Sequence, residues 1–167
     1  FESFVNPLTP IPEYITQMTG ITDLMLAKAP VIDEILPAFL EFAGSAEETI
    51  IVAHNAPFDL SFLKSAAKEL DLDWPKFKTL DTVTIARQVL SKEDVPNCKL
   101  STLAQFFGTK TEPNHRALDD AKATTEILHG LIERLGSFEV YNVDSLMEFA
   151  KTAAHIQRQN YWGLSST

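Results

Sequence analysis

The sequence predicts an α/β domain, in which buried strands form a sheet that helices flank. Two observations support this fold class. Short apolar runs, typical of central strands, alternate along the chain with longer segments whose apolar residues recur every three or four positions. The chain has 167 residues, of which 45% are hydrophobic and 22% are charged, so it is long enough for one domain with a substantial core.

The first part of the chain is expected to hold two strands with helices between them. Residues 1–5 alternate large apolar and polar side chains before a proline-containing turn, which predicts a short strand. Residues 10–29 are interrupted by prolines and a glycine and are expected to form short helical turns. Residues 31–43 have apolar side chains at helical spacing and are followed by a glycine, so we predict an amphipathic helix. Residues 49–53 are almost wholly apolar, as in a buried central strand.

Strands and helices continue to alternate after this point, which gives the α/β class. Residues 56–70 form a predicted helix with a proline near its first turn, where proline is tolerated. A strand over 77–80 and a helix over 82–90 follow. A short helix over 100–107 and the longest helix, over 116–135, are each expected to end at a glycine.

The C-terminal part is expected to add a helix outside the α/β domain. A connector precedes a predicted helix over 144–159, with Asp144 as its N-cap, and the residues after it show no periodicity. We therefore divide the chain into a domain over residues 1–136 and a C-terminal helical extension or linker over residues 137–167.

Composition excludes several classes of protein. The net charge of −9 argues against binding of duplex DNA through a broad basic surface. It leaves open a nucleic acid held in a cleft whose charge metal ions neutralise. Cys98 is the single cysteine, so we expect no disulfide framework, no cysteine zinc site, and a reducing cytoplasmic setting. No apolar run approaches the ~20 residues that a membrane span needs.

Asp59 is the first candidate for chemistry. Helical geometry places it on the line through Leu63 and Leu70, the predicted centre of the apolar face of its helix. A carboxylate there must be paired or metal-bound, because desolvation of an isolated charge is costly. An acid in the first turn could also serve the helix dipole, but that explains an exposed residue better than an inward-facing one. We favour the functional interpretation.

Two adjacent acids open the longest predicted helix. The residues that form its predicted apolar face are Leu118, Ala121, Leu128, Ile132 and Leu135. Asp119 lies on the opposite side and is expected to be a solvated surface charge. Asp120 lies at the edge of the apolar face, where it can point along the boundary between core and cleft. Asp120 is therefore the functional candidate.

His115 precedes this helix on a predicted loop. A lone histidine is more often structural or exposed than catalytic. This one stands about one helical turn before Asp120, a suitable position for a general base near a metal-bound water. His129 and His155 lie within helices without such partners, and we assign them no role.

Polar residues also follow two of the predicted strands. His54 and Asn55 come directly after the strand over 49–53, and ligands usually bind at the carboxyl ends of strands in open α/β sheets. Polar turn chemistry alone would also explain Asn55. Asp81 closes the next strand, and we favour a role as the cap of the following helix, with an accessory role in the site as the alternative.

Taken in order, these segments resemble the DnaQ-like 3′–5′ exonucleases of the DEDDh class, which have an RNase H-like fold. VAHNAPFDLSFL is similar to the second motif of that family, whose acid falls on Asp59. NHRALDDAKAT is similar to the third motif, His-x4-Asp, which maps to His115 and Asp120. FVNP, MTGIT, TLDTVTIAR and LSTLAQFFG also match the family's progression, so the resemblance covers about residues 1–135.

The resemblance implies a metal-dependent enzyme that cleaves the terminal phosphodiester of a nucleic acid. Such enzymes use two Mg²⁺ or Mn²⁺ ions about 4 Å apart, which stabilise the attacking and leaving oxygens. Asp59 and Asp120 would be metal ligands, and His115 would accept the proton of the attacking water.

The same resemblance implies a substrate pocket and a set of partners. His54, Asn55 and Phe58 would surround the terminal nucleotide, while Met18 and Thr19 would touch the terminal bases. We expect the 3′ end of single-stranded DNA rather than RNA as substrate, in proofreading or repair. The C-terminal extension is similar to the connector that leads to a polymerase or to a GIY-YIG nuclease module, although a simple terminal helix would explain it equally well.

One part of the family pattern has no counterpart here. The first motif, Asp-x-Glu, supplies the remaining two carboxylates from the first strand, and no residues of this chain match it. Phe1–Val5 is similar to the third strand, so we expect the RNase H-like mixed sheet to lack its N-terminal strands, which would occupy about 25–30 residues upstream. The chain alone is then expected to have negligible activity. The alternative is a non-catalytic DnaQ-like module that binds nucleic acid or a polymerase.

Overall fold

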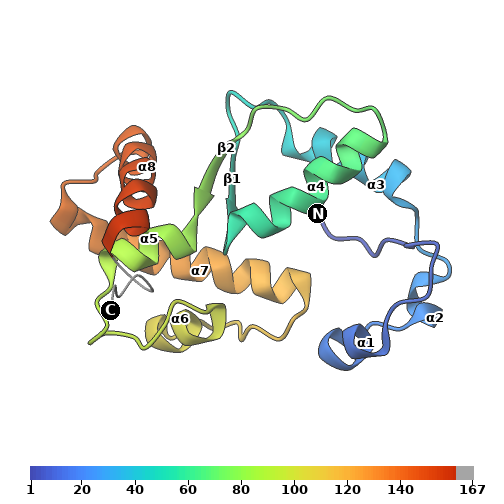
Figure 1. The fold of residues 1–167 in the computed structure, drawn as a ribbon, viewed down its shortest axis with the longest axis horizontal. Helices are drawn as coiled ribbons and strands as arrows, with labels where there is room; N and C mark the ends of the chain where they lie inside the picture. The colour runs from blue at the N-terminus through green and yellow to red at the C-terminus, as the bar shows by residue number, and fades with distance from the viewer. Residues whose placement is uncertain (161–167) are drawn as a thin grey trace.

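A small parallel sheet lies at the centre of the computed structural model, which describes residues 1–160 (Figure 1). Strand β1 (Ile50–Ala53) pairs with β2 (Lys78–Asp81), with Ile50 opposite Lys78 and Ala53 opposite Asp81. Parallel strands need a long crossover connection, and helix α4 (Ala56–Glu69) supplies it. Because both strands end at the same edge, the polar residues that follow them are brought together.

Helices surround this sheet and complete the α/β fold. In Figure 1, α3 and α4 lie on one side of the strands and α8 on the other, while α5, α6 and α7 lie beneath them. The remaining elements are α1 (Glu13–Thr19), α2 (Asp23–Leu26), α3 (Ile32–Ala43), α5 (Thr82–Val89), α6 (Leu100–Phe107), α7 (Ala117–Leu135), the 3-10 turn η1 (Gly136–Phe138) and α8 (Val143–Asn160). The predicted strands and helices from residue 31 onward are confirmed, each to within one residue at either end. The tail beyond residue 160, expected to lack periodicity, lies outside the described residues.

The strand predicted over residues 1–5 is wrong. A strand requires a neighbour that accepts and donates its backbone hydrogen bonds, and β1 and β2 are the two strands of the described residues. Residues 1–5 instead run along the surface, where the ring of Phe1 packs edge-on against that of Phe39 with 6.2 Å between centroids. The described part of the sheet is therefore a parallel pair, without the antiparallel strand that a mixed sheet would contain.

The bounds of the helices agree with the prediction, but the residues at two helix ends act differently from what we expected. Asp144 lies in the first turn of α8 and does not cap it, because the side chain of Asn142 accepts a 2.9 Å hydrogen bond from the backbone N–H of Ser145. Gly44 ends α3 in a backbone conformation with positive φ, as expected for a glycine stop. Gly136 follows the last residue of α7, as predicted, but it has no positive φ. Its φ of −57° is helical, and the chain continues into η1.

The core lies between α5, α6 and α7, where Ile85, Leu103 and Ile127 have no solvent exposure. The buried face of α7 is rotated from the predicted one. Its fully buried members are Ala123, Thr124, Ile127, Leu131 and Leu135. Ala121 and Ile132, which we expected to face inward, are exposed. Periodicity could not separate these neighbouring faces, because both carry apolar residues.

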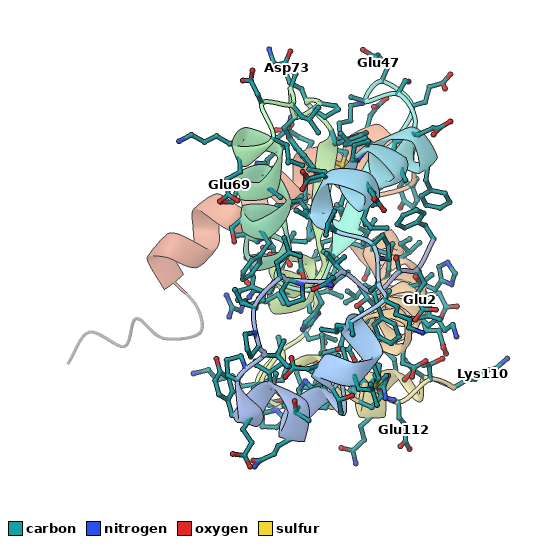
Figure 2. The ribbon with its side chains drawn as sticks, turned by 90° about the vertical axis from the view of Figure 1, so that its right-hand side faces the viewer. Glu2, Glu47, Glu69, Asp73, Lys110 and Glu112 are labelled. Atoms are coloured by element: carbon teal, nitrogen blue, oxygen red, sulfur yellow. The ribbon has the colours of Figure 1, made fainter. Side chains whose placement is uncertain are left out.

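The excess of acidic residues is carried by the surface. Glu47, Glu69 and Asp73 are exposed and lie at the periphery of the molecule (Figure 2). Among residues 1–160, no helix combines the length and the apolar character that a bilayer span requires.

Close packing between α6 and α7 gives a test of the core. A Cβ added to Gly130 would lie 2.8 Å from Cε1 and 2.9 Å from Cγ of Phe107, closer than real side chains approach. Gly130→Ala is therefore expected to lower the free energy of unfolding by about 1–2 kcal/mol, since overpacking outweighs the gain in helix propensity. Gly136→Ala is the control, because an added Cβ there meets no atom within 4 Å. Urea unfolding measures both, and a Gly130→Ala protein as stable as the control would refute this packing.

Candidate functional site

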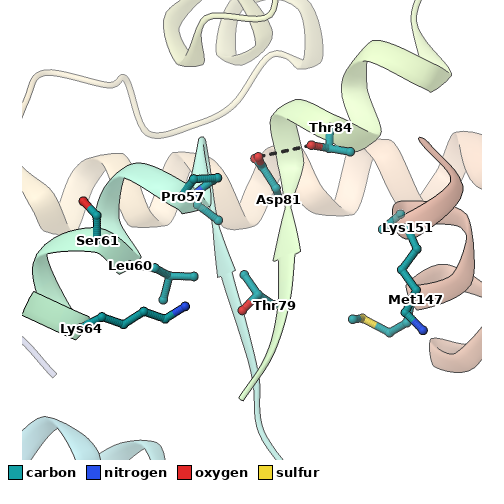
Figure 3. Close-up of a pocket in the computed structure, with 11 residues that line it drawn as sticks. Pro57, Leu60, Ser61, Lys64, Thr79, Asp81, Thr84, Met147 and Lys151 are labelled. Atoms are coloured by element: carbon teal, nitrogen blue, oxygen red, sulfur yellow. Dashed lines mark hydrogen bonds between the residues drawn. The ribbon is translucent and has the colours of Figure 1, made fainter. Parts of the chain in front are cut away.

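The carboxyl ends of β1 and β2 are joined by Asp81. Its Oδ1 accepts hydrogen bonds from the backbone N–H of Asn55 at 2.9 Å and of Val83 at 3.0 Å. Its Oδ2 accepts from the hydroxyl of Thr84 at 3.3 Å (Figure 3). The favoured prediction, that Asp81 caps the following helix, is confirmed. The same carboxylate also fixes Asn55, which begins α4 in the left-handed conformation with φ of 69°.

His54 is held by both of its ring nitrogens. Its Nε2 lies 3.0 Å from the carbonyl oxygen of Cys98, and its Nδ1 lies 2.9 Å from the hydroxyl of Thr82. Because a carbonyl can only accept, Nε2 carries a hydrogen and donates it. Burial lowers the pKa of His54, which favours the neutral ring, so Nδ1 accepts from Thr82. A ligand can therefore meet only the ring face of His54.

Asp59, His115 and Asp120 line one cavity of about 570 Å³, together with His54. Asp59 comes from the first turn of α4, Asp120 from the first turn of α7, and His115 from the loop before α7. Asp59 and His115 are exposed and Asp120 is half-buried. Groups that are distant in sequence thus converge on a solvent-accessible hollow at the ends of the strands.

Asp59 occupies the flank of its helix rather than the centre of the apolar face. The fully buried residues of α4 are Ala56, Leu60 and Ala67. The line through Leu63 and Leu70 is only half-buried, so our prediction of the face centre is wrong. Although its side chain is exposed, partial burial raises the pKa of Asp59, and the negative charge of Asp81 adds to that shift. A cation bound to Asp59 would lower the pKa of this carboxyl group.

Asn114 organises the loop that carries His115. Its backbone N–H donates to Oδ1 of Asp120 at 3.1 Å, and its side-chain oxygen accepts from the N–H of Arg116 at 3.0 Å. Between these bonds His115 has φ of 64°, an uncommon conformation for a residue other than glycine. Such conformations cluster at functional sites, where the surroundings enforce them. Asn114 has a positioning role that we had not predicted; the signal was a short polar residue just before a helix.

The two neighbouring acids of α7 have different surroundings. Asp119 accepts from the side-chain amide of Asn114 at 2.9 Å and lies 3.8 Å from the ammonium of Lys122. These are local surface contacts. Asp120 lines the cavity and lies one turn before the buried Thr124. Both acids are half-buried, and Asp120 lines the cavity whereas Asp119 does not.

Three residues that we expected to contact the substrate do not line this cavity. Phe58 is 60% exposed and packs edge-to-face against Phe62 at 5.0 Å, outside the residues described as lining this cavity. Met18 is 49% exposed at the end of α1, and the hydroxyl of Thr19 is bonded to the carbonyl of Ile15. The end of α1 does reach the residue that precedes α7, since a Cβ added to Gly20 would lie 3.4 Å from Nη2 of Arg116.

Two further cavities border the same junction. One of about 980 Å³ shares His54, His115 and Asp120 with the first and adds the cations Arg87 and Lys99. The other, of about 590 Å³, lies between α4, β2 and α8 (Figure 3). Of the predicted site residues, this third cavity includes Asp81 alone. The candidate chemistry therefore belongs to the cavities of about 570 Å³ and 980 Å³.

Arg87 was part of a segment that we compared with the family, but we gave it no role. It lies on the same face of α5 as the buried residues Val83 and Leu90. A cation at helical spacing with apolar residues was the sequence signal that could have found it.

The donors in the first cavity suit a hard divalent cation in part. Carboxylate oxygens are the ligands that Mg²⁺ and Mn²⁺ prefer, and Mg²⁺ is often held by one or two carboxylates, with waters and substrate phosphates as its other ligands. Asp59 and Asp120 supply two such groups. Within the described residues, no group of three or more His, Cys, Asp or Glu side chains could hold a metal ion. The residues present fit one loosely held ion better than a complete pair.

Comparison with known proteins places the chain in a family. Residues 1–128 match the RNase_T family model, which is described as Exonuclease. The chain is 44% identical over 158 residues to a protein of Mycobacterium tuberculosis (strain CDC 1551 / Oshkosh) named as a bifunctional exonuclease/endonuclease, covering 95% of this chain and 24% of that protein. It is 47% identical over 146 residues to a DNA polymerase III PolC-type of Caldanaerobacter subterraneus subsp. tengcongensis, covering 87% of this chain and 10% of that polymerase. The chain thus spans a quarter or less of the length of these relatives.

The fold is similar to that of a solved exonuclease. The structure titled Exonuclease X in complex with 5′ overhanging duplex DNA matches with a TM-score of 0.62 and 23% identity, over 87% of this chain and 78% of that one. This likeness confirms the expected RNase H-like α/β fold.

The role of Asp81 at the strand ends can be measured. Asp81→Ala removes the cap of α5 and the acceptor of the Asn55 N–H, so the free energy of unfolding is expected to fall by about 1–2 kcal/mol. Asp81→Asn keeps an acceptor oxygen and should cost less. Asp73→Ala, at an exposed acid, serves as the control. If chemical unfolding shows the same stability for the Asp81→Ala and Asp73→Ala proteins, Asp81 does not tie the strand ends together.

Proposed function

The chain belongs to the RNase_T family of exonucleases, and from this premise we propose that it forms a metal-dependent 3′–5′ exonuclease site. The reaction is hydrolysis of the terminal phosphodiester of a nucleic-acid strand. The observation that carries the proposal is the cavity of about 570 Å³ in which Asp59, His115 and Asp120 converge. Two carboxylates and a histidine at the ends of parallel strands are suited to activating water near a phosphate.

Each of the three residues has a separate role in this proposal. Asp59 and Asp120 hold Mg²⁺ or Mn²⁺ through their carboxylate oxygens. When bound, such ions lower the pKa of water and stabilise negative charge on the attacking and leaving oxygens. His115 accepts the proton of the attacking water on a ring nitrogen. Its exposed position on a loop fixed by Asn114 leaves the imidazole open to the cavity.

The residues around the terminal nucleotide act mainly by packing. The face of the His54 ring and the side chain of Asn55 border the neighbouring cavity, where they can contact the sugar and base. Phe58, in its exposed pair with Phe62, offers a ring on which a base can stack. Met18 is better placed than Thr19 to touch a base, because the Thr19 hydroxyl is already bonded within α1.

We propose single-stranded DNA as the preferred substrate, ahead of RNA. The net charge of −9 disfavours a broad grip on a duplex, whereas a strand end needs only a local site. The name of the polymerase relative supports DNA as the substrate, and we propose a role in proofreading or repair. The chain spans a small part of the polymerase and nuclease relatives. We therefore also propose that it works beside a polymerase or a second nuclease module in the same protein.

Asp59 and Asp120 are too few ligands for two ions, since each hard cation takes about six oxygen ligands and residues 1–160 hold no group of three or more His, Cys, Asp or Glu side chains suited to a metal. We therefore propose that the chain alone turns over substrate negligibly, and that further carboxylates complete the site in the full-length protein. The small number of carboxylate ligands also favours a second candidate function. In that case the chain is a non-catalytic module that binds nucleic acid or a polymerase.

Activity of the full-length protein separates these candidates. With Mn²⁺ and 3′-labelled single-stranded DNA or RNA, we expect release of nucleotides from the 3′ end, with the DNA degraded faster. Asp120→Ala should lower kcat by about 10²–10³-fold or more, as expected when a group that stabilises transition-state charge is removed.

The matched control is Asp119→Ala, because Asp119 is the adjacent acid and lines neither of these two cavities. It should retain most of the activity. Equal losses in the two variants would refute the assignment of Asp120. Binding of DNA without any metal-dependent hydrolysis would instead support the non-catalytic module.

A further inference from the structure

Arg87 lies beside the proposed active site, and no ion pair within the described part of the chain includes it. It is half-buried on α5 and lines the cavity of about 980 Å³ that also includes His115 and Asp120. Its Nε is buried and has no hydrogen-bond partner.

An unpaired buried donor of this kind requires an explanation. Buried charged groups are almost always paired, because desolvation without a partner is costly. Acids are abundant in this chain, with 23 Asp and Glu against 14 Lys and Arg. Two acids line the same cavity, but Asp81 is bonded to the start of α5 and to Asn55, and Asp120 is bonded to Asn114. The guanidinium group of Arg87 therefore remains available to an anion from outside the chain.

The start of α6, which also lines the cavity, is suited to an anion as well. Lys99 is exposed there and stands at the N-cap of α6, where no side chain caps the helix. Leu100 and Ser101, the first residues of α6, line the cavity. Uncapped N–H groups at a helix start favour negative charge, and here they add to the charges of Arg87 and Lys99.

We propose that Arg87, with Lys99 and the start of α6, binds an internal phosphate of the substrate strand. This inference rests on the proposed function. A guanidinium group donates two parallel hydrogen bonds to a phosphate, which an ammonium group cannot do. Because this cavity and the one lined by Asp59 share His54, His115 and Asp120, the bound phosphate belongs to the strand whose terminal nucleotide is being removed.

The consequence is a preference for strands over isolated nucleotides. A substrate with one phosphodiester and no further phosphate occupies the Asp59 cavity alone. An oligonucleotide also engages Arg87. Arg87 and Lys99 line only the larger cavity and Asp59 lines only the smaller one, so an extended strand can present a phosphate to each.

The test compares two substrates of the full-length protein with Mn²⁺. One is a 3′-labelled single-stranded DNA oligonucleotide, and the other is the p-nitrophenyl ester of thymidine 5′-monophosphate. Arg87→Met keeps the length of the side chain and removes its charge. We expect it to lower kcat/KM for the oligonucleotide, relative to the ester, by about 10-fold or more through a higher KM. Arg87→Lys should give an intermediate loss.

Lys92→Met is the matched control, since Lys92 is an exposed cation outside the cavities described above. It should leave both activities unchanged. The slope of log affinity against log salt for the oligonucleotide should become shallower by about 0.7 in Arg87→Met, as for the loss of one phosphate contact with a single strand. An unchanged ratio of the two activities would overturn the proposal.

Stability distinguishes a substrate contact from a structural role. Arg87 makes no hydrogen bond through Nε that its replacement could break, so the Tm of Arg87→Met should be unchanged or raised. A lower Tm with equal losses on both substrates would also overturn the proposal. If the wild-type protein hydrolyses neither substrate, the proposed function fails, and oligonucleotide binding without metal still tests Arg87. A 10-fold weaker affinity in Arg87→Met would support the subsite, and an unchanged affinity would refute it.

Discussion

The carboxylate of Asp81 is the interaction on which the candidate site depends. It accepts hydrogen bonds from residues that follow both strands, and so sets the start of α4 relative to the start of α5. Asp59 lies in the first turn of α4, and Arg87 lies on α5. The bond from His54 to the Cys98 carbonyl then attaches the segment before α6 to the same junction. One acid and one histidine thereby hold the walls of two cavities in place, and in our proposal the ring face of His54 also contacts the substrate.

Charge is divided across these cavities. Asp59 and Asp120 line the smaller one, and Arg87 and Lys99 line the larger one, which Asp120 borders as well. Cations suit the first group and phosphates suit the second. A strand that binds with its terminal phosphodiester at the acids and an internal phosphate at Arg87 satisfies both. This arrangement explains how a chain with a net charge of −9 can hold a polyanion.

The sequence predicted the elements well and their orientation less well. Helical spacing and glycine stops gave the bounds of α3 to α7 because these signals are local. The strand expected over residues 1–5 failed because pairing is not a local property. The faces of α4 and α7 were rotated, since apolar side chains on adjacent faces make period alone ambiguous. Asn114 and Arg87 each carried a weak sequence signal that we did not use, and their roles depend on which loops and helices meet at the strand ends.

The central claim, that Asp59 and Asp120 form one divalent-metal site, is tested most directly by Mn²⁺ binding to the full-length protein, followed by electron paramagnetic resonance. Asp59→Ala and Asp120→Ala should each weaken Mn²⁺ affinity by about 10-fold or more, because each removes a charged ligand. Asp119→Ala should bind Mn²⁺ as the wild type does. Unchanged affinity in both Asp59→Ala and Asp120→Ala would contradict the account.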